Sequence, residues 1–369
     1  MKSKCIILCL ILTLLVNLNS ISLASTNSKE LQKTDVIYVT SEAEMFFDSI
    51  DMEVINPETK KVDILDKRVL WIEDELINDF KETLNKRYNQ GLKTVIISDL
   101  FTKDEIKEFY GFKNLPSKLK ESDYKMSESS YEEGTKIGFV AYRCNEHDVF
   151  AHINVIDIEE DLEYALVHAT KYDYSRLFEK DEVINTRDAY SWSVADSDTG
   201  SVTGQGITVD ASLQLFYDTC SPDADGDYYY HSKITNESES IDSSRVGLCR
   251  TTMLGSNGSA ILEYGPENQT VSSGSSVTYS LGFGIAGISY NPSSKVKIYK
   301  DSGGVNNRKL SIYHQPKNLF GFNTTTYSLI SKADYVASMC SSSYYVNGTA
   351  ASEGNNGIAI GVSLSADKD

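Results

Sequence analysis

The stretch Ile207–Tyr217, which reads ITVDASLQLFY, indicates how the second half of this chain folds. Its odd-numbered residues are apolar and alternate mostly with polar ones. Successive side chains of a strand point to opposite faces of a sheet, so this pattern is typical of a half-buried antiparallel strand. Similar alternation recurs in 277–285 and 358–364, and turn signals such as Asn347-Gly348 separate the runs. Residues 191–369 are therefore predicted to form an antiparallel all-β, sandwich-like domain.

The first half of the chain mixes strand-like and helix-like patterns. Apolar runs at 35–40, 68–72, 94–98, 136–142 and 149–156 predict strands, and periodic segments at 76–88, 102–111 and 157–169 predict helices. This order indicates a small α/β domain over residues 35–175. The expected fold class is thus α+β with two domains, joined by a linker at 176–190.

Charge distribution supports a boundary between the two halves. Residues 25–190 hold 36 acidic and 22 basic residues, whereas residues 191–369 hold only 17 and 11. The whole chain has a formal net charge of −18. A protein this acidic is expected to repel nucleic acid and anionic lipid headgroups, and no basic cluster interrupts the trend. Because binding to a phosphate backbone depends on Lys and Arg, nucleic acid is excluded as an expected partner.

The N-terminus predicts export. Lys2 and Lys4 precede the apolar run Cys5–Val16, and Ser22-Leu23-Ala24 places small residues where a signal peptidase cuts. A dozen residues give a helix of roughly 18 Å, which is shorter than the roughly 30 Å core of a bilayer. Residues 1–24 are predicted to be a cleaved secretory signal that leaves no membrane span, and 25–34 a disordered start. The expected location is secreted, extracellular.

Four cysteines remain after signal cleavage, and three pairings are open to them. A disulfide between Cys220 and Cys249 is favoured, because both lie at ends of candidate strands that flank one polar segment. Cys144 and Cys340 would then join the two halves. The alternative is that buried thiols stay unpaired.

Three aspartates form the main candidate metal site. Asp223, Asp225 and Asp227 alternate around Gly226, which resembles the start of a calcium loop. An EF-hand is excluded, because its twelfth position would be Ile234 and not an acid. A weak Ca²⁺ site, with Asp218 or Glu237 nearby, is the hypothesis; no other cofactor is expected. The alternative is a solvated Asp-Gly turn, and Asp196 and Asp198 suggest a second acidic turn.

Two features of the β-rich half suggest binding or membrane action. Tyrosine is abundant, with clusters at Tyr228–Tyr230 and Tyr344-Tyr345, and exposed Tyr suits glycan or protein partners, although Tyr also packs well in sheets. The nearly uncharged segment Ser272–Ile288 alternates bulky and small residues, as a membrane-inserting hairpin requires. A buried sandwich strand would show the same alternation.

The five histidines are scattered and no catalytic motif accompanies them, so no catalytic residue is assigned. The expected function is therefore that of a non-catalytic extracellular binding or surface-interaction protein, whose partner is an unidentified glycan or protein. A membrane-active, pore-forming β protein is the alternative. An extracellular hydrolase with an unrecognised site comes third.

Overall fold

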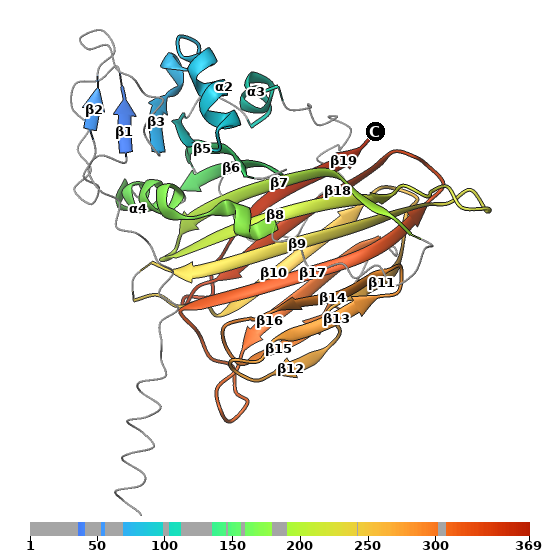
Figure 1. Cartoon of the computed structure of the whole chain (residues 1–369). Helices are drawn as coiled ribbons and strands as arrows, with labels where there is room; N and C mark the ends of the chain where they lie inside the picture. Colours follow the sequence, from blue (N-terminus) through green and yellow to red (C-terminus); the bar gives the residue numbers. More distant parts are fainter. Residues whose placement is uncertain are drawn as a thin grey trace, which may run out of the picture.

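The protein is described here by a computed structural model, which covers residues 36–40, 53–55, 69–98, 103–111, 135–144, 147–155, 159–178, 190–241, 243–301 and 308–369. The expected signal (1–24) and disordered start (25–34) lie outside the described residues, as does the side chain of Cys144. The chain is mostly β, with a large mixed sheet and a second, antiparallel sheet (Figure 1).

Eleven strands form the mixed sheet, in the order β11-β17-β9-β8-β7-β6-β5-β4-β3-β1-β2. In chain order these are β1 (Val36–Val39), β2 (Glu53–Ile55), β3 (Val69–Glu73), β4 (Lys93–Ile97), β5 (Thr135–Cys144), β6 (His147–Val155), β7 (Trp192–Gly204), β8 (Ile207–Asp218), β9 (Tyr228–Ser240), β11 (Ala260–Gly265) and β17 (Ser328–Met339). The pairing is parallel among β1 to β4 and between β6 and β7, and antiparallel elsewhere. One sheet therefore runs through both predicted domains.

Six strands form the second sheet, in the order β12-β15-β16-β10-β18-β19. They are β10 (Leu248–Gly255), β12 (Gln269–Val271), β15 (Val296–Lys300), β16 (Lys309–Pro316), β18 (Tyr344–Glu353) and β19 (Ala359–Lys368). The remaining strands, β13 (Val277–Leu281) and β14 (Ile285–Tyr290), pair only with each other. The six-stranded sheet packs on one face of β7, β8, β9 and β17, called the inner face, and the two sheets enclose a shared core.

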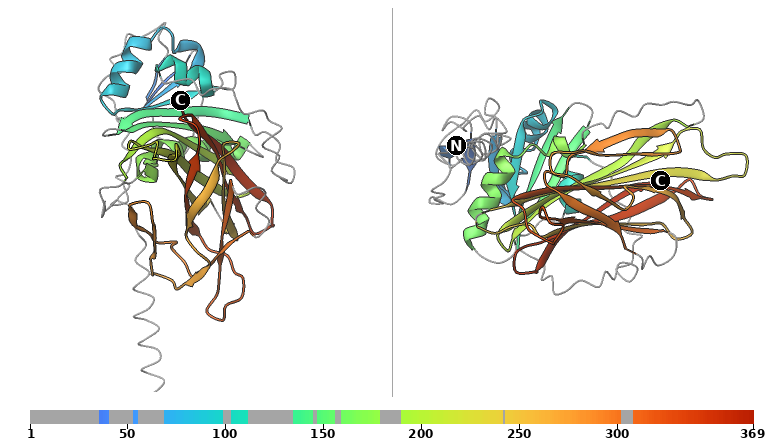
Figure 2. Two further views of the ribbon diagram at one scale, coloured as in Figure 1. Left: turned by 90° about the vertical axis from the view of Figure 1, so that its right-hand side faces the viewer. Right: turned by 90° about the horizontal axis from the view of Figure 1, so that it is seen from below.

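The helices cover the N-terminal part of the mixed sheet. They are the 3-10 helices η1 (Asp74–Leu76) and η3 (Tyr174–Phe178) and the α-helices α2 (Lys81–Asn89), α3 (Lys103–Phe109) and α4 (Glu159–Lys171). Figure 2 shows α2 and α3 on the opposite side of these strands from α4. Leu84 and Ile106 belong to the core under α2 and α3, whereas Leu166 and Phe178 belong to the core under α4 and η3.

Two expectations about organisation need correction. The predicted linker at 176–190 begins too early, because Leu177 and Phe178 are buried in the core at the end of η3. The expected acidic turn at Asp196 and Asp198 is instead the middle of strand β7. These carboxylates accept hydrogen bonds from the backbone N–H groups of Asp367 and Ser365 in β19, at 3.2 and 2.9 Å. They therefore join an interior strand of the mixed sheet to edge strand β19 of the second sheet.

The polar segment between Cys220 and Cys249 also differs from expectation. It contains β9, a central strand whose even-numbered residues Tyr230 and Ile234 enter the sandwich core. Its odd-numbered residues face outward, and among them His231 and Glu237 are buried by other elements. The face of β7, β8, β9 and β17 that points away from the six-stranded sheet is called the outer face below.

Candidate functional site

A turn between β16 and β17 presents large apolar side chains to solvent. This segment, Lys317–Asn323, is called the apolar loop. Leu319, Phe320 and Phe322 are 90%, 85% and 68% exposed, and these are the highest values among the exposed large hydrophobic residues of the described chain. Single exposed apolar residues are ordinary, but three in one turn mark an interaction surface.

The apolar loop has a defined shape. The side-chain oxygen Oδ1 of Asn318 accepts hydrogen bonds from the backbone N–H groups of Phe320 and Phe322, at 2.9 and 3.0 Å. The Asn318 N–H donates to the Phe322 carbonyl at 2.9 Å, and the base is closed by a bridge between Lys317 and Asn323. Gly321 has φ of 86°, a left-handed conformation that favours glycine. The chain thus holds three apolar side chains outward, and they do not collapse onto the body.

The loop projects from the lower end of the molecule in Figure 1. Residues 269–327 contain six basic residues and one acid, a net charge of +5 in a chain of −18. Of these, Lys295, Lys297 and Lys317 lie at the loop end of the sheet, because Val296 pairs with Pro316 and Lys297 with Gln315. Arg308 and Lys309 lie at the opposite end of β16. Positive charge next to exposed apolar side chains is typical of surfaces that contact lipid.

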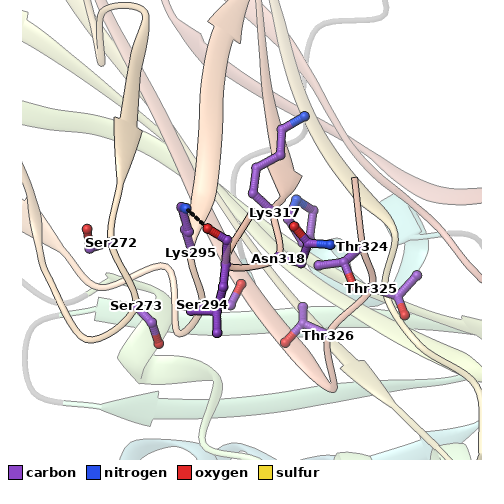
Figure 3. A pocket seen from close by; sticks show the side chains of 11 residues that line it. Ser272, Ser273, Ser294, Lys295, Lys317, Asn318, Thr324, Thr325 and Thr326 are labelled. Atoms are coloured by element: carbon purple, nitrogen blue, oxygen red, sulfur yellow. Dashed lines mark hydrogen bonds between the residues drawn. The ribbon is translucent and has the colours of Figure 1, made fainter. Parts of the chain in front are cut away.

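A pocket of about 600 Å³ lies at the base of the apolar loop (Figure 3). Three segments line it: the β12–β13 turn, the start of β15 and the β16–β17 connection. The lining residues are Ser272, Ser273, Ser294, Lys295, Pro316, Lys317, Asn318, Leu319, Thr324, Thr325 and Thr326. The Nζ atom of Lys295 donates to the Leu319 carbonyl at 3.3 Å, which connects the pocket to the loop.

The hairpin β13–β14, Val277–Tyr290, lies against the outer face and is called the docked hairpin. Cross-strand pairs place Val277 opposite Tyr290 and Tyr279 opposite Ile288 on one side, and Thr278 opposite Ser289 on the other. The apolar side is buried and the polar side is exposed. The segment predicted to suit membrane insertion is thus an amphipathic hairpin packed on the sandwich.

The docked hairpin is fastened at a buried carboxylate. Tyr279 donates a hydrogen bond to Asp334 Oδ2 on β17, and His231 Nε2 lies 2.9 Å from Asp334 Oδ1. Asp334 is fully buried, which alone would raise its pKa, yet hydrogen bonds from His231 and Tyr279 and the positive charge of Lys233 lower the pKa below its usual value. The carboxylate is therefore ionised at neutral pH and holds the hairpin through Tyr279.

Two further contacts position the hairpin. Trp192 Nε1 donates to the carbonyl of Phe283 at the hairpin tip, at 2.9 Å. Gly265 lies directly under the Tyr279 ring, where a Cβ atom would come within 2.2 Å of the ring carbon Cδ2. Only glycine at this position allows the ring to pack on edge strand β11.

The predicted calcium site is a turn closed by its own hydrogen bonds. Asp223 Oδ1 accepts from the N–H groups of Asp225 and Asp227, both at 2.9 Å, and Oδ2 accepts from the Tyr229 hydroxyl at 2.6 Å. No group of three or more metal-ligating side chains gathers within the described ranges. Asp223, Asp225 and Asp227 therefore adopt the Asp-Gly turn given as the alternative, and the calcium prediction gains no support.

The two acids named as additional calcium ligands have other roles. Asp218 Oδ1 accepts from the N–H groups of Ser191 and Cys220, at 2.8 and 3.1 Å. Glu237 bonds to Tyr172 and Arg176 beneath η3. Glu237 thus lies in a separate contact and does not join the aspartate turn.

The predicted disulfide is not formed. Cys220 and Cys340 are exposed free thiols, and Cys249 is a buried one. The Cys249 thiol donates to Ser238 at 3.5 Å and accepts from Ser352 at 3.0 Å, and burial raises its pKa to about 11. The expected pairing of Cys220 with Cys249 fails because β10 directs Cys249 into the sandwich core, whereas Cys220 lies in an exposed turn.

Among the histidines whose side chains are described, His168 and His231 pair with acids, His314 is buried, and His152 Nδ1 lies 3.1 Å from the Thr199 carbonyl oxygen. These contacts form no hydrolytic triad. His168 Nε2 lies 2.8 Å from Asp210 Oδ2, and the hydroxyl of Ser201 donates to Asp210 Oδ1 at 2.7 Å. The serine and the histidine therefore bond to the same carboxylate, whereas a triad requires the histidine to bond to the serine. Burial lowers the pKa of His314 to about 3, so its ring is neutral.

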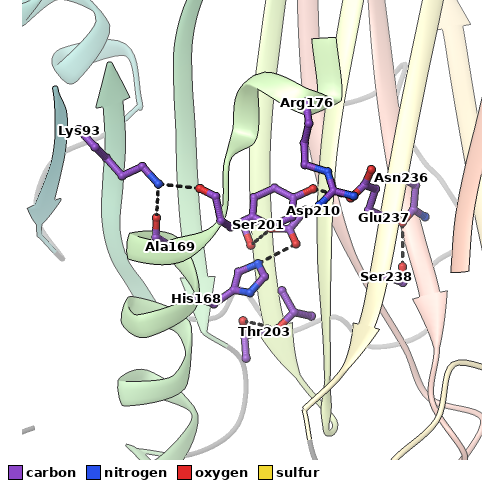
Figure 4. Close-up of polar contacts among 12 residues, drawn as sticks. Lys93, His168, Ala169, Arg176, Ser201, Thr203, Asp210, Asn236, Glu237 and Ser238 are labelled. Atoms are coloured by element: carbon purple, nitrogen blue, oxygen red, sulfur yellow. Dashed lines mark hydrogen bonds and ion pairs between the residues drawn. The ribbon is translucent and has the colours of Figure 1, made fainter. Parts of the chain in front are cut away.

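His168 belongs to a polar junction that holds α4 and η3 on the outer face (Figure 4). Tyr172 donates to Glu237 at 2.7 Å, and Arg176 lies 3.1 Å from the same carboxylate. Burial would lower the pKa of His168, but the neighbouring Asp210 carboxylate raises it above its usual value. These contacts attach the helical part of the chain to the β-sandwich.

The tyrosine clusters divide between the core and the surface. Tyr230 and Tyr344 are buried and stacked, with ring centroids 4.3 Å apart, so they serve packing. Tyr228, Tyr229 and Tyr345 are partly exposed. The apolar loop was not foreseen, although the sequence NLFGFN at 318–323 contains its signal: three large apolar residues around a turn-forming glycine.

Comparisons with known proteins give no family. No protein-family model matches the chain, and no curated protein matches it. Among solved structures, delta-toxin of Clostridium perfringens has a TM-score of 0.31 and 11% identity, with 52% of this chain and 90% of that chain covered. The membrane-inserted form of the C. perfringens NetB toxin gives a TM-score of 0.25 and 6% identity, with coverage of 48% and 94%.

A third solved structure is the collagen-binding subdomain of the Enterococcus faecalis surface protein ACE. Its TM-score is 0.21 and its identity 9%, with 38% of this chain and 88% of that chain covered. Scores of this size do not establish a common fold. Among the described residues, no helix is both long and apolar enough to cross a membrane.

Proposed function

We propose that this chain is an exported protein that binds lipid membranes through the apolar loop. The observation that supports this most strongly is the exposure of Leu319, Phe320 and Phe322 on one rigid turn. Export follows from the sequence pattern of residues 1–24, and it would bring the loop into contact with membranes outside the producing cell. This proposal keeps the expectation of a non-catalytic binding protein and replaces the glycan or protein partner with a bilayer.

The energetics favour a lipid partner. Full burial of one Leu or Phe side chain contributes roughly 1.5–3 kcal/mol, so three of them can supply about 5–9 kcal/mol before the costs of binding are subtracted. Lys295, Lys297 and Lys317 lie at the loop end of β15 and β16, so this end of the molecule carries positive charge in a chain of −18.

Pore formation is the second candidate function, and the docked hairpin favours it. The 27 residues from Asn268 to Ser294 contain no charged side chain. β13 and β14 have five and six residues, fewer than the roughly 9–11 residues with which a strand spans a bilayer. Ten uncharged residues lie on each side of the turn at 282–284. A hairpin that spans a bilayer would therefore need the segments that flank β13 and β14, residues 272–276 and 291–294, to become strand as well.

Binding and leakage experiments with lipid vesicles test both functions. The wild-type protein should co-sediment with phosphatidylcholine vesicles and release a trapped dye from them. Phe320→Ser should weaken both binding and release. Tyr279→Phe, which removes the hydroxyl that binds Asp334, should leave binding unchanged and accelerate release. Absence of vesicle binding by the wild-type protein would overturn the proposed function, and binding without release would overturn pore formation alone.

A further inference from the structure

The pocket beneath the apolar loop has the chemistry of an anion site. Its lining carries Ser and Thr hydroxyls and the ammonium group of Lys295, and no carboxylate lines it. Lys317 lines it as well, but the Lys317 ammonium donates to Asn323 Oδ1. A chain with 53 acidic residues places none of them here, so a cation would find no charged ligand in the pocket. Ammonium and hydroxyl groups together are suited to phosphate oxygens.

One hydroxyl of the pocket lacks a hydrogen-bond partner. The Oγ atom of Ser294 is buried and unpaired, although Ser294 lines the pocket. A buried polar group left without a partner costs about 1–3 kcal/mol. A bound oxygen atom would remove this cost, and Ser294 directly precedes Lys295, so hydroxyl and ammonium lie on the same strand start (Figure 3).

The position of the pocket identifies the source of the anion. Asn318 and Leu319 belong to both the pocket lining and the apolar loop. When the loop side chains enter the apolar part of a bilayer, the pocket at the loop base lies at the level of the headgroups. We propose that this pocket binds the phosphate of an anionic phospholipid headgroup, with Lys295 as the principal cation and Ser294 as a hydrogen-bond donor. This inference rests on the proposed membrane function.

The same pocket touches the docked hairpin. Ser272 lies in the linker before β13, and Ser294 and Lys295 lie in the linker after β14. Extension of the hairpin into longer strands would pair these linkers with each other, because Val277 already pairs with Tyr290. The paired linkers would leave the β16–β17 connection, and the pocket would be dismantled. A ligand that binds only the intact pocket stabilises the conformation in which the hairpin is docked on the outer face. Headgroup binding would therefore precede insertion of the hairpin into the membrane.

The test compares two variants that remove one positive charge each. Lys295→Gln removes the pocket ammonium, whereas Lys297→Gln removes an exposed ammonium two residues further along β15. Binding is measured to vesicles of phosphatidylcholine alone and to vesicles that also contain phosphatidylglycerol. We expect the wild-type protein and Lys297→Gln to bind the anionic vesicles about tenfold more tightly, and Lys295→Gln to lose this preference while still binding phosphatidylcholine, because one charge-assisted contact is worth about a factor of ten.

Two further measurements test whether the hydroxyl of Ser294 contributes to binding apart from the charge of Lys295, and whether the bound phosphate belongs to a lipid or is free in solution. Ser294→Ala, which changes no charge, should reduce the preference for anionic vesicles. Soluble glycerol phosphate should raise the melting temperature of the wild-type protein and leave that of Lys295→Gln unchanged. A melting-temperature shift without any vesicle preference would overturn the lipid as the source of the phosphate.

The failure of this inference is distinct from failure of the proposed function. Equal wild-type binding to both vesicle types, or equal losses in Lys295→Gln and Lys297→Gln, would overturn the pocket as a headgroup site while membrane binding stands. Absence of binding to either vesicle type would overturn membrane binding itself.

Discussion

Replacing Phe320 with Ser should weaken membrane binding without affecting the fold. The side chain is 85% exposed, so almost all of its apolar surface is available for transfer into lipid, and its removal costs roughly 1.5–3 kcal/mol of binding free energy. A factor of ten in affinity corresponds to about 1.4 kcal/mol, so the partition coefficient should fall at least about tenfold. The melting temperature should stay within error of the wild type, because Phe320 contributes nothing to a buried core.

The assay is flotation of the protein with phosphatidylcholine vesicles at several lipid concentrations. Leu262→Ser is the matched control, since Leu262 is 43% exposed at the bulge of edge strand β11 and lies outside the apolar loop. This control should retain wild-type partitioning. Unchanged partitioning of Phe320→Ser, or an equal loss in Leu262→Ser, would refute the assignment of binding to the loop.

The remaining predictions concern the docked hairpin, the helical junction and the thiols. Tyr279→Phe removes a hydrogen bond to a buried carboxylate, which costs about 1.5–3 kcal/mol, so amide hydrogen exchange in β13 and β14 should accelerate; unchanged exchange would contradict the fastening role. The pKa of His168 is raised in the folded protein, so the pairing of His168 with Asp210 stabilises the fold. This stabilisation is fully present below pH 6.5, the pKa of histidine in the unfolded chain, and it is lost as the pH rises through the pKa of the folded protein. His168→Gln should therefore lower the melting temperature more at pH 6 than at pH 9, and a constant difference would contradict this. A thiol reagent should modify Cys220 at once and Cys249 only after unfolding, because Cys249 is buried with its pKa raised to about 11; rapid modification of Cys249 in the folded protein would contradict its placement.

The sandwich could be predicted from the sequence because its strands alternate clearly. Strands such as Ile207–Asp218 and Ala359–Lys368 match the expected segments closely. β7 and β9 were missed because their polar residues face other elements and not solvent: Asp198 accepts a hydrogen bond from β19, and Glu237 bonds to Tyr172 beneath η3. Single-sequence patterns show polarity but not which buried partner satisfies it.

The candidate site was foreseen only in part. The uncharged segment at Ser272–Ile288 was recognised as suitable for a membrane hairpin, and the structure contains a hairpin there. Its fastening to Asp334 and His231 joins residues more than 45 positions apart along the chain, so spacing could not indicate it. The apolar loop has a short local signal, but exposure is a property of the fold: the sequence alone does not distinguish Phe320 from a buried aromatic residue.

An environment-sensitive dye at position 319 tests the central claim most directly. Leu319→Cys would carry the dye in a background where Cys220 and Cys340 are replaced by Ser, and Leu262→Cys would carry it in the comparison protein. On addition of phosphatidylcholine vesicles, the dye at 319 should shift to the blue and become accessible to quenchers within the lipid, while the dye at 262 stays in water. Vesicle binding with no change at 319, or with the same change at 262, would contradict membrane contact through the apolar loop.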